Sequence, residues 1–190
     1  MLDTESRYCN CLPLGNPEFS DIQDEQMIYV DKTGLIYKIA VRRVPMFLSR
    51  PRRFGKSLLI NTLASLFGSV IKKFRGLDIE KKWTDKTYKV IKIDFSRLAS
   101  NDPETFKCEL SATITREFGL VGSISASDAL GVRDPDSILD EIAKDLANNS
   151  TVLLIDEYDA PLTHDINNPV ALNEIISILN GFYATAKQYT

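Results

Sequence analysis

The stretch from residue 45 to residue 67 most constrains how this chain can fold. Residues 45–48 form a short apolar run, and a basic loop at residues 50–57 follows it. From Lys56 onward, leucines at positions 58, 59, 63 and 66 recur at helical spacing, and Gly68 stands where such a helix would end. A strand, a glycine-containing loop and an amphipathic helix in this order are typical of α/β proteins.

The loop at residues 50–57 matches part of a phosphate-binding template. The template is a glycine, four residues of any kind, then Gly, Lys and Ser or Thr. Gly55, Lys56 and Ser57 match it, whereas Arg50 replaces the first glycine. At the start of a helix the loop can bind phosphates, with Lys56 reaching the β- and γ-phosphates and Ser57 offering its hydroxyl to Mg²⁺. The alternative is a basic turn that opens an ordinary helix.

An acidic pair follows a second apolar run. Residues 152–155 are apolar, and Asp156 and Glu157 come directly after them. Residues 151–155 are therefore predicted to form a central strand buried on both faces, with carboxylates at the edge where open α/β sheets bind ligands. We expect Asp156 to hold Mg²⁺ through a water and Glu157 to act as a general base toward an attacking water. The alternative is a strand followed by an acidic turn.

The remaining sequence alternates predicted strands with predicted helices. Strands are predicted at residues 27–30, 45–48 and 89–95. A helix with Leu35, Ile36 and Ile39 on its apolar face is predicted after a cap at residues 31–34. Further helices are predicted from Pro103 to about 118, at 134–146 and at 169–184, with a surface insertion at 119–133. This pattern predicts an α/β three-layer sandwich around a mostly parallel sheet, with residues 1–25 as a lead-in and 26–190 as one P-loop domain.

Composition excludes several classes of protein. The net charge is −3 and no apolar run approaches the length of a membrane span, so neither a membrane protein nor a broadly basic nucleic-acid binder is expected. Direct nucleic-acid binding by this segment is not expected, because its basic clusters lack aromatic stacking platforms. The N-terminus is polar and unlike a secretory signal, and the three cysteines are predicted to be reduced, as in the cytoplasm.

Four separated blocks carry a family resemblance. They lie in order at residues 12–15, 29–33, 50–57 and 154–161. With these blocks the chain resembles the AAA-ATPase-like family of bacteria, in which an arginine at the position of Arg50 is typical. The resemblance implies ATP and Mg²⁺ as cofactors, and ATP hydrolysis that drives or regulates a partner. Members often carry a PD-(D/E)XK nuclease-like domain after the ATPase part, and homo-oligomers are a second kind of assembly to expect.

The resemblance also implies a strand that the sequence does not supply. In this class of P-loop proteins a strand with a polar sensor residue follows the acidic motif and lies between the P-loop strand and the acidic strand. Few residues follow Glu157, and residues 169–184 are predicted to be helical. We therefore expect a sheet that is incomplete at its C-terminal end, in either a fragment or a naturally short protein.

The expected site residues fall into three groups. Catalytic roles are assigned to Glu157, Lys56 and Arg53, and metal binding to Ser57 and Asp156. Nucleotide binding is assigned to Arg50, Pro51, Arg52, Arg53, Phe54, Gly55, Lys56, Ser57 and Leu58. Arg52 and Arg53 either stabilise charge on the transferred phosphoryl group or pair with Asp159 or Glu157 to hold the loop.

Other residues permit both a functional and a structural interpretation. Tyr29, Asp31 and Lys32 either line the adenine or ribose side of the pocket or end a strand and cap a helix. Asp159 is a candidate for orienting Lys56 or Arg53. Two residues are expected to have ordinary roles: His164 as an exposed loop residue and Trp83 as a core anchor.

Three functions are compatible with these motifs. The leading hypothesis is an ATPase domain. The alternatives are a nucleotide-binding regulatory module without its own turnover, and an inert remnant that neither binds nor hydrolyses ATP.

Overall fold

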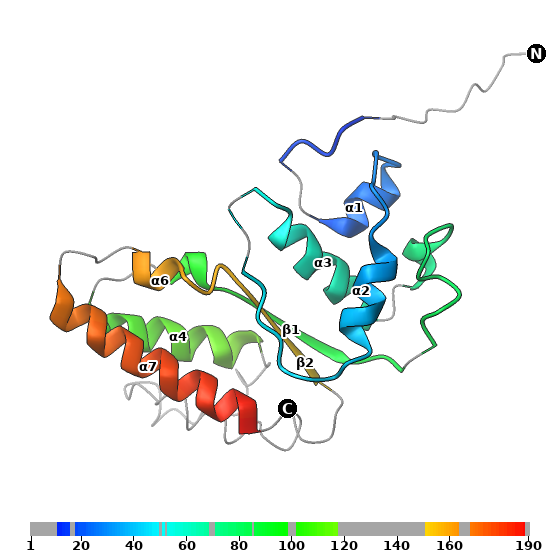
Figure 1. Ribbon diagram of the computed structural model, residues 1–190. Helices are drawn as coiled ribbons and strands as arrows, with labels where there is room; N and C mark the ends of the chain where they lie inside the picture. Colours follow the sequence, from blue (N-terminus) through cyan, green and yellow to red (C-terminus); the bar gives the residue numbers. More distant parts are fainter. Residues whose placement is uncertain are drawn as a thin grey trace, which may run out of the picture. The chain divides into compact units, whose positions relative to one another are not determined.

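The computed structural model of the chain describes residues 11–15, 18–49, 51, 53–68, 71–84, 86–98, 102–117, 151–163 and 168–188. The chain divides into two compact units, whose elements Figure 1 labels. The first unit comprises Met1–Arg43 and Phe47–Thr87, and the second comprises Val44–Met46 and Tyr88–Thr190. Within the described ranges, no helix has both the length and the apolar character needed to cross a membrane.

The first unit is built from short helices around an aromatic core. Its elements are α1 (Phe19–Asp24), α2 (Thr33–Ala40), α3 (Lys56–Phe67) and the 3₁₀ turn η1 (Ile71–Phe74). Both α1 and α2 pack against α3. Phe19 of α1 is fully buried, and its ring stacks on Phe74 with centroids 4.5 Å apart. This aromatic pair fixes α1 to the unit, since buried rings dominate the energetics of small cores.

Helix α3 has the predicted bounds. Gly55 is its N-cap and Gly68 its C-cap. Leu63 and Leu66 are buried on the predicted apolar face, and Leu58, near the start, is half-buried. Local signals sufficed here because a helix satisfies its backbone hydrogen bonds within its own segment.

The second unit combines a parallel pair of strands with helices. Its elements are β1 (Lys89–Asp94), the 3₁₀ turn η2 (Phe95–Arg97), α4 (Pro103–Glu117), β2 (Thr151–Asp156), α6 (Ala160–Thr163) and α7 (Pro169–Gln188). Strands β1 and β2 pair from Lys89 with Thr151 to Asp94 with Asp156. In the part of the chain that the structure describes, the sheet contains these two strands. Parallel strands with helices confirm the α/β class.

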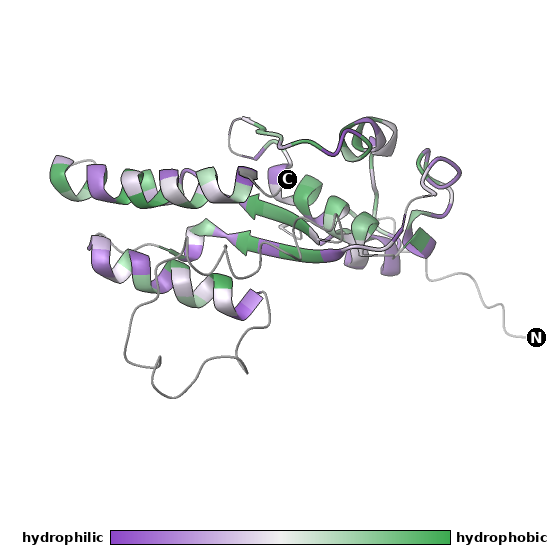
Figure 2. Cartoon of the chain, turned by 90° about the horizontal axis from the view of Figure 1, so that it is seen from below, coloured by the Kyte–Doolittle hydropathy of each residue, from purple (hydrophilic) through white to green (hydrophobic). Residues whose placement is uncertain are grey.

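One face of this sheet carries the core of the second unit. Ile91 pairs with Leu153 and Ile93 with Ile155, so all four side chains share a face. Helix α4 packs on β1, and α7 packs on α4, as Figure 1 shows. The core continues through Phe95 and residues of both helices. Figure 2 shows the apolar residues of both strands in green.

Two predicted strands are absent, so these predictions were wrong. Residues 27–30 and 45–48 have no strand pairing among the described residues. Ile28 donates its amide to the Cys11 carbonyl at 3.0 Å, which is a single bond and not a ladder. In the other segment Phe47 is 70% exposed, and Pro45 has no N–H to donate. Short apolar runs favour strands, but a strand also needs a partner with matching backbone groups.

Two burial patterns also differ from the prediction. Leu35 is 59% exposed, whereas Thr33, Ile36 and Ala40 form the buried face of α2. In β2 only Leu154 is buried, so the expected burial on both faces was wrong. The buried face of a helix depends on the surface against which it packs. The burial of a strand depends on its neighbours, and β2 has one neighbouring strand among the described residues. Sequence periodicity reveals neither.

Other predicted elements are confirmed. Strand β1 shows the predicted alternation, α4 begins at Pro103, and α7 covers 169–184 and continues to Gln188. The described residues after Glu157 form a turn and the helices α6 and α7. The predicted insertion at 119–133 and helix at 134–146 lie outside the described residues.

Candidate functional site

In the loop before α3, left-handed residues precede the right-handed helix. Arg53 (φ 66°) and Gly55 (φ 73°, ψ 27°) are left-handed, and the right-handed helix begins at Lys56. A change of hand of this kind turns successive N–H groups toward one side and forms a concavity that binds anions. The start of α3 adds the partial positive charge of its first turn. The backbone of this loop therefore fits a phosphate group.

Gly55 is required by the backbone conformation and leaves open space above it. A β-carbon at Gly55 would have no atom within 4 Å, so neighbouring protein does not fill this region. A residue with a side chain would pay about 1–2 kcal/mol for the left-handed conformation. The glycine thus keeps the loop in a shape that leaves its amides accessible to a ligand.

The side chains of the loop differ in exposure. Lys56, Ser57 and Leu58, in the first turn of α3, are half-buried. Arg53 and Phe54 are exposed, and among the described residues Arg53 has no hydrogen bond or ion pair. Pro51 is exposed, while Arg50 and Arg52 lie outside the described residues, so their roles remain predictions.

The acidic residues lie where β2 ends. Asp156 is the last residue of the strand, and its Oδ1 accepts a hydrogen bond from the Glu157 amide at 3.0 Å. Glu157 itself is left-handed (φ 48°), and its carbonyl accepts from the Ala160 amide at 2.9 Å, which closes the turn into α6. Left-handed residues other than glycine cost energy and recur at functional sites. This turn holds two adjacent carboxylates in a fixed backbone geometry.

Asp159 occupies the same turn. Its Oδ1 is buried and has no hydrogen-bond partner among the described residues. A buried carboxylate oxygen without a partner is costly, because it loses its hydration. The structure thus identifies Asp159 as an acceptor that a cation or donor could satisfy. The predicted contact with Lys56 or Arg53 remains a prediction.

Asp94 is a further acidic residue that the sequence analysis did not select. It ends β1 and pairs in register with Asp156 at the end of β2. Its Oδ1 accepts the Ser96 amide at 2.9 Å. The signal was present in the sequence, since Asp94 ends an apolar-alternating strand just as Asp156 ends an apolar one. Only strand pairing shows that the two lie side by side.

The block at residues 29–33 has a structural explanation. The Oδ1 atom of Asp31 accepts the amide (2.8 Å) and hydroxyl (2.6 Å) of Thr33, and its Oδ2 accepts the amide of Asp78 (2.8 Å). Burial alone would raise the pKa of Asp31, but the hydrogen bonds from Thr33 and Asp78 outweigh it and hold this pKa below its ordinary value. The buried Thr33 hydroxyl also accepts the Ile79 amide at 3.2 Å. Asp31 thus joins the start of α2 to the segment around residue 78.

Tyr29 belongs to the same block and contacts helix α3. Burial raises its pKa, the hydrogen bond with Thr62 of α3 lowers it, and the Asp31 charge raises it further. The ring also meets Phe19 edge-on, with centroids 5.3 Å apart. These contacts account for Tyr29 without a ligand. Lys32 is exposed, and a nucleotide contact by either residue stays a prediction.

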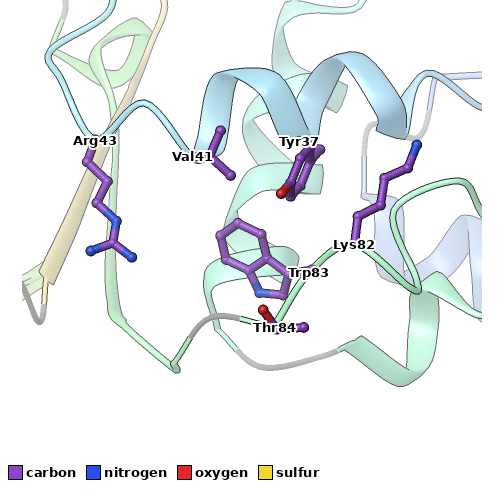
Figure 3. Close-up of a pocket in the computed structure, with 6 residues that line it drawn as sticks. All are labelled: Tyr37, Val41, Arg43, Lys82, Trp83 and Thr84. Atoms are coloured by element: carbon purple, nitrogen blue, oxygen red, sulfur yellow. The ribbon is translucent and has the colours of Figure 1, made fainter.

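Trp83 is a core anchor, as predicted. It is 8% exposed, and its ring meets Phe67 edge-on at 5.4 Å. It also lines an open pocket of about 220 Å³ together with Tyr37, Val41, Arg43, Lys82 and Thr84 (Figure 3). Lys82 pairs with Asp78 at 2.7 Å. His164 lies outside the described residues.

The expected metal ligands belong to different units. Ser57 starts α3 in the first unit, and Asp156 ends β2 in the second. Among the described residues, no group of three or more His, Cys, Asp or Glu side chains could hold a metal ion by itself. A hydroxyl and a carboxylate fit Mg²⁺, which commonly takes one or two carboxylates together with phosphate and water oxygens.

Comparison with known proteins places these features in a family. A family model described as "Predicted AAA-ATPase" matches residues 13–190. The chain belongs to the AAA-ATPase-like family. The match includes both the loop before α3 and the strand β2 of the AAA-ATPase-like chain.

A curated relative extends beyond this AAA-ATPase-like chain. It is a protein of Azotobacter chroococcum mcd 1 described as "Uncharacterized protein in vnfD 5'region". The two are 31% identical over 178 residues, which is 93% of this chain and 34% of the relative. The chain thus spans about a third of that relative's length. No solved structure matches the chain significantly.

Proposed function

We propose that this chain is an ATP-binding domain that hydrolyses ATP with Mg²⁺. The observation that carries the proposal is the left-handed backbone at Arg53 and Gly55 before the start of α3 at Lys56, a conformation that suits anion binding, within a family of predicted ATPases. The acidic turn after β2 supports it. The proposed fold is the three-layer P-loop sandwich, of which the described sheet and helices of the second unit would form part.

The residues of the loop would bind the triphosphate. The amides after Gly55 would hold phosphate oxygens, and Lys56 would add a positive charge at the β- and γ-phosphates. Arg53 would stabilise charge on the transferred phosphoryl group. Its exposure and its lack of a described partner support this role over a structural one.

The acidic turn would supply the metal site and the base. Ser57 and Asp156 would hold Mg²⁺, which when bound neutralises charge on the phosphates. Glu157 would accept a proton from the attacking water. The left-handed backbone at Glu157 separates its direction from that of Asp156, so two adjacent carboxylates can take two roles.

Thermal melting with and without ATP and Mg²⁺ tests the binding step. A ligand that binds only the folded state stabilises it by about 2.7 kcal/mol at 100 times its Kd. Lys56→Ala is expected to abolish the shift, and Lys38→Ala, which removes an exposed lysine from α2 of the same unit, is expected to keep it. An unchanged shift in Lys56→Ala would show that Lys56 does not bind phosphate.

Phosphate release tests the chemical step. Glu157→Gln is expected to retain the ATP-dependent shift and to lose turnover, because the change removes the base and leaves the strand and Asp156 in place. If Glu157→Gln hydrolyses ATP like the wild type, another group activates the water. A wild type that binds ATP without turnover supports the alternative function, a regulatory module.

The process driven by ATP is a separate proposal. The chain covers 34% of its relative, so a partner domain in a longer protein is a natural target of the energy. A nuclease-like domain and assembly with further copies of the chain are the partners that the family resemblance implies. Sequencing downstream of residue 190 tests the first of these directly.

A further inference from the structure

Asp94 and Asp156 form a matched pair at the ends of two neighbouring strands. They pair in register in a parallel sheet, so their side chains lie on the same face. Neighbouring strands of a sheet are about 4.8 Å apart, which sets the spacing of the two residues. This face is opposite to the one that carries Ile91 and Ile93 and the core. The pairing thus places two carboxylates next to each other, away from the helices α4 and α7.

Each carboxylate has one oxygen held by a backbone amide. The Oδ1 of Asp94 accepts the Ser96 amide at 2.9 Å, and the Oδ1 of Asp156 accepts the Glu157 amide at 3.0 Å. In each case a backbone N–H just beyond the strand holds one oxygen. The other oxygen of Asp94 lies 3.8 Å from Nε of Arg97, whose side chain is 80% exposed, so this contact is weak. One carboxylate oxygen of Asp94 and one of Asp156 therefore remain for a ligand.

We propose that Asp94 is a second carboxylate of the magnesium site, where it accepts a hydrogen bond from a water bound to the ion. This inference rests on the proposed ATPase function and adds a positioning residue to it. Mg²⁺ dehydrates reluctantly and keeps several waters, which carboxylates nearby can orient. Adjacent like charges are also stabilised by a divalent cation. Two carboxylates are too few to hold Mg²⁺ alone, so metal binding should depend on the nucleotide.

A magnesium titration at fixed ATP tests this role in the full chain. The readout is the Mg²⁺ concentration that gives half of the maximal metal-dependent thermal shift. Asp94→Asn keeps an oxygen for the Ser96 amide and removes the charge. We expect it to raise this concentration by about tenfold or more, as loss of a metal site's outer partner does. The ATP-dependent shift measured in EDTA should be unchanged, because Asp94 does not touch the nucleotide.

Two further variants complete the test. Asp102→Asn is the matched control, since Asp102 is an exposed aspartate of the same unit that accepts the Thr105 amide at 2.8 Å, and its magnesium midpoint should stay within twofold of the wild type. Asp94→Ser also removes the charge and retains an acceptor for the Ser96 amide. It should raise the magnesium midpoint as expected for Asp94→Asn, and it replaces that variant if Asp94→Asn folds poorly.

The outcomes separate this inference from the proposed function. If Asp156→Asn shifts the magnesium midpoint and neither Asp94 variant does, the role of Asp94 is wrong and the ATPase proposal stands. If the Asp94 variants also lose ATP binding in EDTA, Asp94 acts on the fold or the nucleotide, and the metal role is wrong. If the wild type shows no ATP-dependent shift at all, the proposed function fails and this inference fails with it.

Discussion

The two units carry candidate functional residues of different kinds. In the first unit the proposed phosphate site relies on backbone conformation, with left-handed residues at 53 and 55 leading into α3. In the second unit the acidic turn is made by side chains that end two paired strands. A site built from backbone amides tolerates changes of side chain. The proposed phosphate site would therefore be compatible with an arginine at position 50, where the template has glycine.

The supports under the two parts also differ. The first unit orients its loop through α3, which is held by α1, α2 and the contact between Tyr29 and Thr62. The second unit orients its turn through the sheet, whose core face is covered by residues of α4 and α7. Helix packing fixes the direction of one end of a helix, and strand pairing fixes the spacing of neighbouring side chains. Helix packing therefore orients the proposed phosphate site, and strand pairing positions the acidic residues.

The largest expected effect contrasts a core phenylalanine with a loop phenylalanine. Phe182 is fully buried in the second unit, and Phe54 is 64% exposed in the first. Phe182→Ala should lower the free energy of unfolding by about 3–5 kcal/mol through lost burial and a cavity. Phe54→Ala should change it by less than about 0.5 kcal/mol. Urea denaturation measures both free energies of unfolding. Similar losses of stability in the two variants would show that Phe54 is buried and that the loop before α3 is not exposed.

A second test concerns two glycines of the first unit. Gly55 and Gly15 have nearly the same φ (+73° and +72°), and a β-carbon on either would meet no atom within 4 Å. Gly55→Ala and Gly15→Ala should each lose about 1–2 kcal/mol of stability, because alanine resists the left-handed conformation. Only Gly55→Ala should also lose the ATP-dependent shift. Equal retention of that shift would show that the loop backbone does not hold phosphate.

A third test uses pH and compares two aspartates, one in each unit, whose carboxylates accept hydrogen bonds from a nearby threonine. The pKa of Asp31 is held low in the folded state, so its contribution is complete above its unfolded pKa of about 3.9 and is lost as pH falls through the folded pKa. Asp31→Asn should lose about 0.5–1.5 kcal/mol near pH 7 through a weakened hydrogen-bond set. Below about pH 4 the difference from wild type should shrink toward zero.

Asp102 provides the comparison in the second unit. The hydroxyl and then the amide of Thr105 lower its pKa, and Asp102 is exposed. Asp102→Asn should therefore show the same direction of pH dependence with a smaller amplitude. A larger amplitude for Asp102 than for Asp31 would contradict the view that Asp31 joins two segments of the first unit. Urea titrations between pH 2 and pH 8 measure both.

The smallest expected effect contrasts two tyrosines with raised pKa values. The Tyr183 hydroxyl is buried without a hydrogen-bond partner among the described residues, and burial, followed by the neighbouring Tyr158, raises its pKa to about 12. Tyr183→Phe should leave stability unchanged or increase it by up to about 1 kcal/mol at pH 7. Wild-type stability should also fall between about pH 10 and pH 12, where the hydroxyl ionises first in the unfolded chain. The variant should lack the part of this fall due to Tyr183.

Tyr29→Phe should act in the opposite direction. Tyr29 in the first unit shares a hydrogen bond with Thr62, so its loss should cost about 0.5–1.5 kcal/mol. If Tyr183→Phe were the more destabilising of the two, the Tyr183 hydroxyl would have a partner in the folded protein. Unfolding free energies at pH 7 decide between these outcomes.

Much of the local structure could be predicted from the sequence. Helix α3 has both predicted ends, and α4 and α7 start at the predicted prolines. Helices are predictable because their hydrogen bonds, caps and apolar faces repeat within one segment. The strand predictions at 27–30 and 45–48 failed because an apolar run cannot specify a partner.

The residues of the candidate site were selected from the sequence, and their roles remain predictions. The Gly-Lys-Ser triplet and the two acids after an apolar strand are the motifs that selected Gly55, Lys56, Ser57, Asp156 and Glu157. The left-handed conformation of Arg53 and Glu157 was not foreseen, because no glycine or asparagine marks these positions. The block at 29–33 was visible as a motif, but its contact with Asp78 was not.

The sequence by itself determined the helices α3, α4 and α7 and the charged residues that follow β1 and β2, because these features depend on neighbours within a few positions. Tertiary structure decided which distant residues meet. It set Asp94 beside Asp156 and joined Asp31 to Asp78, across 62 and 47 positions respectively. The physical reason is that a strand or a side-chain acceptor completes its hydrogen bonds with groups remote in the chain, and local sequence carries no information on which remote group that will be.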